Sequence, residues 1–348
     1  MINRESFSEK HIREIQLNTK RDPVLIERVI FAFGLLESLT HSELPFIFKG
    51  GTSLLLLIDE PHRFSTDIDI LVNAEVPFDT YLKKASSIWP FSRIEEQIRP
   101  KVSGIEKRHF KFFYISPLTG KEMHIILDVV FEENYYCKLV DRCIKNDLLI
   151  TEEPYNIVSV PDINSILGDK LTAFAPNTTG IPYNAGKELE IIKQFFDVSI
   201  LMDHSDSLSE VKKTYQAIAA SEIKYRGLRI STDEILQDTM HTAYCIAGRG
   251  QLFTGEYNML IKGINSIKNH IFDKKFSGET AALMACKVAW LAALMLTGKE
   301  AYPAVMDGSH YMSEIITESE HKKLNYIKKI DLKAYGYLIE AMAMLRNG

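Results

Sequence analysis

The chain has 348 residues, of which 46% are hydrophobic, and a formal net charge of -5 at pH 7. This length allows two domains with separate hydrophobic cores. The negative charge argues against a protein covered in positive potential, although nucleic-acid binding needs only a local basic patch. The four cysteines are scattered with no Cys-x-x-Cys pair, which favours reduced thiols over a disulfide scaffold or a zinc site.

The first forty residues predict helices, and the segment after them alternates between strand and helix patterns. A short apolar run ends in Gly50-Gly51, which indicates a strand that feeds a turn. The elements that we expect next are a strand at 44–48, a helix at 52–59, a strand at 66–72 and a helix at 78–89. Two further runs, 107–115 and 124–131, flank the turn signal Pro117-Leu118-Thr119-Gly120 and predict an antiparallel pair.

Beyond Val160-Pro161 the pattern becomes almost entirely helical. The helices that we expect include 162–174, 189–202, 208–220 and 279–296. The fold class is therefore α+β, with a mixed-sheet domain at 1–160 that includes the N-terminal helices and a helical domain at 161–348.

Only the run 280–297 is apolar enough to suggest a membrane span. It carries Lys287 near its centre, where a charge is costly in a bilayer, so we expect a buried core helix and no membrane. The charged, amphipathic N-terminus predicts no signal peptide, and the expected location is the cytoplasm.

Three aspartates form the candidate metal site. Asp67 and Asp69 lie two apart on a predicted strand, so both carboxylates should project from one face. Two close carboxylates repel each other unless a cation neutralises them, and Mg²⁺ prefers such oxygen ligands, with Mn²⁺ as the alternative metal. Asp128 interrupts the apolar strand HIILDVVF without a packing reason. We expect it to be the third acid, which would allow a two-metal site.

The turn before these acids suits a phosphate group. Gly50 and Gly51 let backbone amides approach an anion, and the helix that opens at Thr52 favours negative charge at its N-terminus. The hydroxyls of Thr52 and Ser53 can add donors. Lys49 and Arg63 lie at the edges of this unit and could hold a triphosphate. Arg63 could equally form a structural ion pair with Asp67 or Asp59.

The sequence resembles the AbiEii/AbiGii-type nucleotidyltransferase toxins of the DNA polymerase β-like nucleotidyltransferase superfamily. The resemblance rests on KGGTSL at 49–54 followed by RFSTDID at 63–69, and it extends over about residues 45 to 200. A family motif of the Asp-Lys-Leu-x-Ala kind is matched at 169–173, which implies that Lys170 contacts nucleotide phosphates. A Lys-Asp-x-x-Asp motif is matched in part at 193–197, with Gln194 in place of the first Asp. That match implies that Asp197 completes the active site.

The leading hypothesis is thus a magnesium-dependent nucleotidyltransferase that uses an NTP and releases pyrophosphate. The resemblance implies an RNA acceptor such as the 3′ end of tRNA, and a toxin with a cognate antitoxin in a toxin–antitoxin or phage-defence system. Two alternatives remain. One is transfer to a small molecule or protein, and the other is a nucleotide-binding regulator without catalysis.

Overall fold

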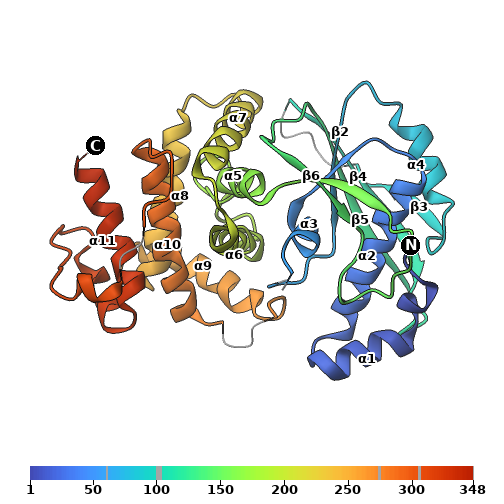
Figure 1. Ribbon diagram of the computed structural model, residues 1–348, viewed down its shortest axis with the longest axis horizontal. Coiled ribbons are helices and arrows are strands. Elements are labelled where there is room, and N and C mark those ends of the chain that lie inside the picture. Colours follow the sequence, from blue (N-terminus) through green and yellow to red (C-terminus); the bar gives the residue numbers. More distant parts are fainter. Residues whose placement is uncertain (60–61, 99–103, 273–275, 305–306, 348) are drawn as a thin grey trace. The chain divides into compact units, whose positions relative to one another are not determined.

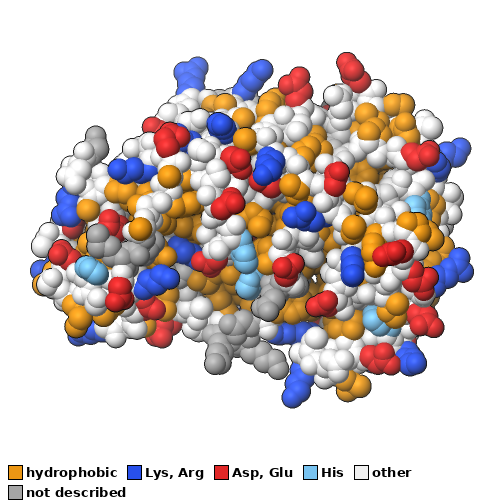
Figure 2. Space-filling view, viewed as in Figure 1, with side chains coloured by type: hydrophobic (Ala, Val, Ile, Leu, Met, Phe, Trp, Pro, Cys, Tyr) orange, Lys and Arg blue, Asp and Glu red, His pale blue; other side chains and the backbone are white. Residues whose placement is uncertain are grey.

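The computed structural model describes the chain except for residues 60–61, 99–103, 273–275, 305–306 and 348 (Figure 1). It divides into two compact units, Met1–Asp162 and Ile163–Gly348. The first unit holds the sheets and the second is helical, so the mixed α+β fold expected from the sequence is confirmed. Acidic and basic side chains intermingle over the face in Figure 2, in keeping with the modest net charge of -5.

The first unit is built on a five-stranded mixed sheet with the strand order β1-β2-β5-β4-β3. β2 and β5 are parallel, and the other neighbours are antiparallel. A second, two-stranded sheet pairs β6 with β7. The strands are β1 Ile47–Lys49, β2 Ile68–Val72, β3 Arg93–Glu96, β4 Glu106–Ile115, β5 Glu122–Phe131, β6 Leu139–Cys143 and β7 Ile157–Pro161. The helices are η1 Arg4–Phe7, α1 Glu9–Thr19, α2 Pro23–His41, α3 Gly50–Leu57 and α4 Phe78–Ser86.

One face of the large sheet is covered by helices. α2 contacts β2 and β5, and α4 packs against α2 (Figure 1). The Phe31 ring of α2 stacks on Tyr114 of β4 with centroids 3.7 Å apart. The buried carboxylate of Glu27 accepts hydrogen bonds from the hydroxyls of Tyr114 and Ser116, at 2.9 and 2.8 Å. This covered face is the core of the first unit, and the opposite face of the strands carries the polar residues described below.

The second unit is a set of packed helices. They are α5 Ile163–Ala173, α6 Glu188–His204, α7 Leu208–Arg226, α8 Thr232–Gly248, α9 Thr254–Ile267, α10 Gly278–Leu296, η2 Gly308–Tyr311, η3 Lys322–Lys329 and α11 Leu332–Asn347. Within the described chain, α10 alone is long and apolar enough to cross a membrane, and 67% of its most apolar window is buried inside the protein. It packs against α8 and α11, while Lys287 pairs with Asp203 at 2.6 Å. The expected core helix is confirmed.

Three strands and three α-helices were not expected individually. β3, β6 and β7 have only four or five residues each, which is too short for a clear strand periodicity, and β3 is also mostly polar. The helices α8, α9 and α11 lie in the part of the chain for which only a general helical pattern was expected. The structure also corrects two details at the candidate site. The helix expected to open at Thr52 begins at Gly50, and the strand expected from residue 66 begins at Ile68. Asp69 is therefore within the strand, whereas Asp67 immediately precedes it.

Candidate active site

A row of four register-paired residues crosses the sheet and defines the candidate site. Lys49 on β1 pairs with Asp69 on β2, Asp69 pairs with Asp128 on β5, and Asp128 pairs with His109 on β4. Directly paired residues of neighbouring strands project from the same face of a sheet. The strand register thus brings together two carboxylates that are far apart in the sequence, and it flanks them with a lysine and a histidine.

The Gly-Gly turn lies directly against this row. Gly50 has φ +79°, a left-handed conformation that favours glycine, and a Cβ there would lie only 2.1 Å from Oδ2 of Asp69. A Cβ on Gly51 would lie 2.5 Å from Nη2 of Arg63 and 2.8 Å from Oγ of Ser65. The two glycines therefore allow the start of α3 to approach the Asp69 carboxylate and the Arg63 guanidinium.

The side chains at the start of α3 hold the turn together. Thr52 Oγ1 donates to the carbonyl of Asp67 at 2.5 Å, and Ser53 Oγ donates to the carbonyl of Gly50 at 2.8 Å. Both side chains are buried. The N-cap residue Lys49 makes no side-chain capping hydrogen bond to the helix. Its side chain lies over the Tyr136 ring, 5.8 Å from the centroid. The backbone amides of the first turn are thus the groups best suited to an anion.

Arg63 is buried and donates from Nη1 to its neighbour's carbonyl, that of Phe64, at 3.0 Å. Its guanidinium lies next to Gly51, at the start of α3. A buried guanidinium keeps its charge, so it also adds positive potential next to the turn.

Asp67 has an arginine neighbour that the sequence did not suggest. Nη2 of Arg28, on α2, lies 3.8 Å from Oδ1 of Asp67. Burial lowers the pKa of His124 on β5 below its ordinary value, and the charges of Lys111 and Arg28 add to that shift. Arg28 thus places a permanent positive charge near Asp67.

His109 holds the third acid. Its Nδ1 lies 2.6 Å from Oδ1 of Asp128, and the two side chains are 17% and 30% exposed. Because an ionised carboxylate can only accept, the imidazole donates from Nδ1. This hydrogen bond fixes the orientation of the Asp128 carboxylate.

The donor set fits a hard divalent cation. Asp69 and Asp128 supply carboxylate oxygens from one face of the sheet, and Asp67 adds a third acid two residues before Asp69. Carboxylates combined with substrate phosphates are the usual ligands of Mg²⁺. Among the described residues, no three His, Cys, Asp or Glu side chains converge closely enough to form a complete metal site by themselves. The fit rests on the two paired carboxylates, which would leave positions on the ion for nucleotide phosphates and water.

The second unit contains the other two predicted site residues, and they contact each other. Nζ of Lys170 on α5 lies 3.0 Å from Oδ2 of Asp197 on α6 and donates to Oε1 of Gln194 at 2.8 Å. The side chains of Lys170 and Asp197 are 9% and 1% exposed. Lys193 points elsewhere and pairs with Glu190 at 2.9 Å. Gln194, which replaces an acid of the family motif, thus shares the lysine with Asp197.

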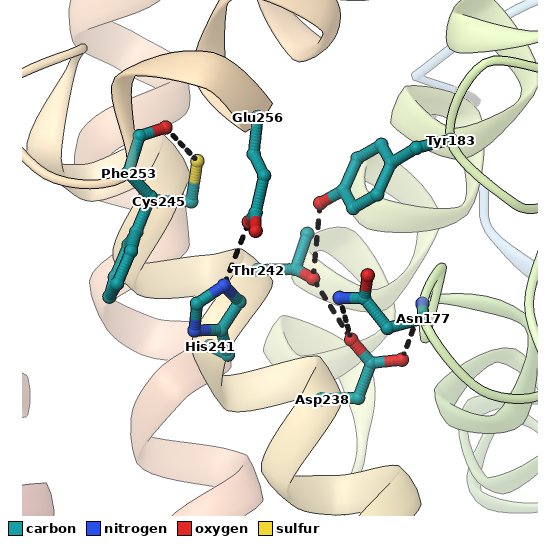
Figure 3. Close-up of polar contacts among 8 residues, drawn as sticks. All are labelled: Asn177, Tyr183, Asp238, His241, Thr242, Cys245, Phe253 and Glu256. Carbon is teal, nitrogen blue, oxygen red and sulfur yellow. Dashed lines mark hydrogen bonds and ion pairs between the residues drawn. The ribbon is translucent and has the colours of Figure 1, made fainter.

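A polar network anchors the loop that joins these two helices (Figure 3). Asp238 on α8 accepts from the backbone and side-chain nitrogens of Asn177 and from the hydroxyl of Thr178, at 2.8, 2.8 and 2.9 Å. Further along the loop, the hydroxyl of Tyr183 lies 3.4 Å from that of Thr242. Burial raises the pKa of Asp238, and its hydrogen bonds oppose that shift. The network fixes the connection between the helices that carry Lys170 and Asp197.

The chain belongs to the AbiEii family of nucleotidyltransferase toxins of type IV toxin–antitoxin systems, whose model matches residues 35–274, more than half of the sequence. The family expected from the sequence is confirmed, and so is nucleotidyl transfer as the enzyme class.

Two solved structures from Helicobacter pylori are similar to this chain. One is JHP933, at 12% identity and a TM-score of 0.43, covering 78% of this chain and 93% of the other. The second is a candidate nucleotidyltransferase, at 13% identity and a TM-score of 0.46, covering 78% of this chain and 96% of the other. No curated protein matches the chain.

Proposed function

We propose that this chain is a magnesium-dependent toxin that transfers an NMP from an NTP to the 3′ end of an RNA, with tRNA as the acceptor, and releases pyrophosphate. The observation that carries the proposal is the register pairing of Asp69 with Asp128 directly beside the Gly50 turn. Membership of a toxin family supports the toxin role and a cognate antitoxin as partner. A cytoplasmic location follows from an RNA substrate.

Each part of the first unit has a role in this proposal. The amides at the start of α3 bind the β- and γ-phosphates, and Lys49 and Arg63 supply positive charge around them. Asp67, Asp69 and Asp128 are the residues that would hold Mg²⁺, and a bound Mg²⁺ would supply positive charge for phosphoryl transfer. Asp128 also orients the acceptor hydroxyl and accepts its proton. Catalysis is mainly positioning and electrostatic stabilisation.

The family resemblance gives Lys170 and Asp197 roles as well. It implies a contact with nucleotide phosphates for Lys170 and a catalytic role for Asp197. In the second unit the two are joined by a buried ion pair, so Asp197 also fixes the position of the lysine.

The test is incubation of the protein with Mg²⁺, each NTP labelled at the α-phosphate, and total cellular RNA. We expect label in an RNA band with the wild type and none with Asp69→Asn. Asp141→Asn is the matched control, because Asp141 is an exposed acid on β6 and should leave transfer unchanged. Label that appears only on protein or only on small molecules would favour the alternative in which the acceptor is a protein or a small molecule. NTP binding without any labelled product would overturn the proposed activity.

A further inference from the structure

The strand order of the large sheet places the Gly50 turn and strand β4 on opposite sides of the acids. The phosphate-binding turn lies at β1 and α3, the acids follow on β2 and β5, and β4 and β3 come next. If the NTP lies on the turn side of the acids, the acceptor hydroxyl must approach Asp128 from the β4 side. This inference rests on the proposed function, and it asks what the face of β4 and β3 offers to an acceptor.

Beyond Asp128, strand register defines which side chains share the face of the acid row. On β4 these are His109, Lys111 and Phe113, and on β3 they are Glu95 and Arg93. Lys107, two residues before His109 on β4, projects from the same face and is exposed. Two lysines thus lie on this face, one on each side of His109 along β4, while the acids Glu95 and Glu122 on the same face pair with Arg93.

Arg93 forms a rigid flat platform at the far end of the strip. Its guanidinium lies over the Phe113 ring, 3.4 Å from the centroid. Nε and Nη2 donate to the two carboxylate oxygens of Glu122 at 3.1 and 2.7 Å, and Nη1 donates to Glu95 at 3.3 Å. The arginine side chain is nevertheless 47% exposed. The guanidinium plane is therefore held on one side and at its edges, and a group in solution can stack on its outer side.

These features fit an RNA strand. Nucleobases in single-stranded RNA stack on aromatic rings and on arginine guanidinium planes, while lysines contact phosphates. Because Glu95 and Glu122 neutralise Arg93, the platform suits the uncharged face of a base and does not suit a phosphate. Lys111 lies between the platform and His109 and has the charge that a phosphate needs.

We propose that this strip, from His109 through Lys111 to the Arg93–Phe113 platform, is the binding surface for the single-stranded 3′ end of the acceptor RNA. His109 and Phe113 are four residue steps apart on β4, which corresponds to about 13 Å. The base on the platform therefore belongs to a nucleotide upstream of the terminal one, whose hydroxyl lies at Asp128. Lys111 contacts a phosphate between them.

Binding of a labelled single-stranded oligoribonucleotide, followed by fluorescence anisotropy without NTP, tests the surface independently of catalysis. We expect Arg93→Ala to weaken binding about tenfold through loss of stacking. Arg93→Lys keeps the charge and should weaken binding similarly, because the plane is lost. Lys111→Ala should reduce the slope of log K against log salt by about 0.7. Lys83→Ala, an exposed lysine on α4 at the covered face, is the control and should bind as the wild type does.

Transfer kinetics separate failure of the surface from failure of the proposed function. For the variants of Arg93 and Lys111 we expect a higher KM for RNA with the KM for NTP unchanged. If the wild type binds RNA and the variants bind it weakly, yet no nucleotide is transferred, the surface stands and the proposed function falls. If the wild type labels RNA and the variants match it in affinity and in KM, the surface is wrong and the proposed function stands. A wild type that does not bind the oligoribonucleotide overturns the surface. Melting curves show which variants are folded. If Arg93→Ala does not fold, Arg93→Lys decides the test.

Discussion

The two units hold their candidate site residues in opposite ways. On the sheet, the acids are partly open, with side-chain exposures of 47% for Asp67 and 30% for Asp128. In the helical unit, Lys170 and Asp197 form a closed ion pair with exposures of 9% and 1%. Open carboxylates side by side are costly in stability and useful for a ligand, whereas a closed pair contributes to the fold as long as both partners are present.

Because of this difference, substitutions in the first unit should mainly change activity, and substitutions in the second unit should mainly change stability. Substitution of a sheet acid should affect catalysis with little effect on folding. Substitution of one member of the helical pair should affect folding first, so a loss of activity there is informative only after stability has been restored. The following predictions are ordered from the largest expected effect to the smallest.

The Lys170–Asp197 pair should give the largest change in stability. Asp197→Leu leaves a buried ammonium group without its carboxylate and should lower the free energy of unfolding by about 3–5 kcal/mol. The double variant Lys170→Met with Asp197→Leu should recover most of that loss, because an apolar pair can replace a buried ion pair. Urea denaturation measures both. A single variant as stable as the wild type would show that the pair is not closed in solution.

The sheet acids should give the largest loss of activity. Asp128→Asn should slow nucleotide transfer roughly a thousandfold, equivalent to about 4 kcal/mol in the barrier, because a metal-binding carboxylate is lost. Stability should stay the same or rise slightly, since Asp69 loses a negatively charged neighbour. Single-turnover kinetics and melting temperature are the measurements. If Asp128→Asn lost both activity and stability, the proposed difference between the two units would be wrong.

The Gly50 turn tests how closely the phosphate-binding segment must approach the acids. Gly50→Ala should lower activity about a hundredfold, because the new Cβ displaces the Asp69 carboxylate that it would meet at 2.1 Å. Gly120→Ala is the matched control, since Gly120 has φ +68° with no atom within 4 Å of its Cβ position. Both variants acquire backbone strain, and only the first should lose transfer. Equal losses would mean that strain alone explains the effect.

His109 should have a smaller, graded effect through Asp128. His109→Phe removes the hydrogen bond and should reduce metal affinity or activity about 10- to 100-fold, as loss of an outer-shell partner does. His109→Asn places an amide near the position of Nδ1 and should restore much of the loss, whereas His109→Gln should not. Mn²⁺ titration and transfer rates are the readouts. An Asn variant as impaired as the Phe variant would rule out a positioning role.

The sequence predicts the sheet site better than its surroundings, for a physical reason. Gly50, Gly51, Asp67 and Asp69 lie within twenty residues, and Asp128 is conspicuous as an acid in an apolar strand. Local periodicity and chemistry are enough to recognise them. Arg28 and His109 became visible only in the structure, because one reaches Asp67 from a helix far upstream and the other depends on the register of β4 with β5.

The second unit depended on resemblance instead of chemistry. Lys170 sits on an ordinary helical pattern, and nothing in the spacing shows that it meets Asp197 and Gln194. Short polar strands such as β3 also escaped prediction, although Arg93 on β3 is part of the proposed RNA surface. Contacts of this kind are set by tertiary packing, which single-sequence patterns do not encode.

The central claim is that Asp69 and Asp128 jointly hold the metal that supports nucleotide transfer. A crystal of the protein with Mn²⁺ and a non-hydrolysable NTP analogue, measured for anomalous scattering, tests it most directly. We expect an anomalous peak coordinated by oxygens of both carboxylates, with the phosphates of the analogue at the Gly50 turn. A bound nucleotide whose metal lies away from these two residues would contradict the account.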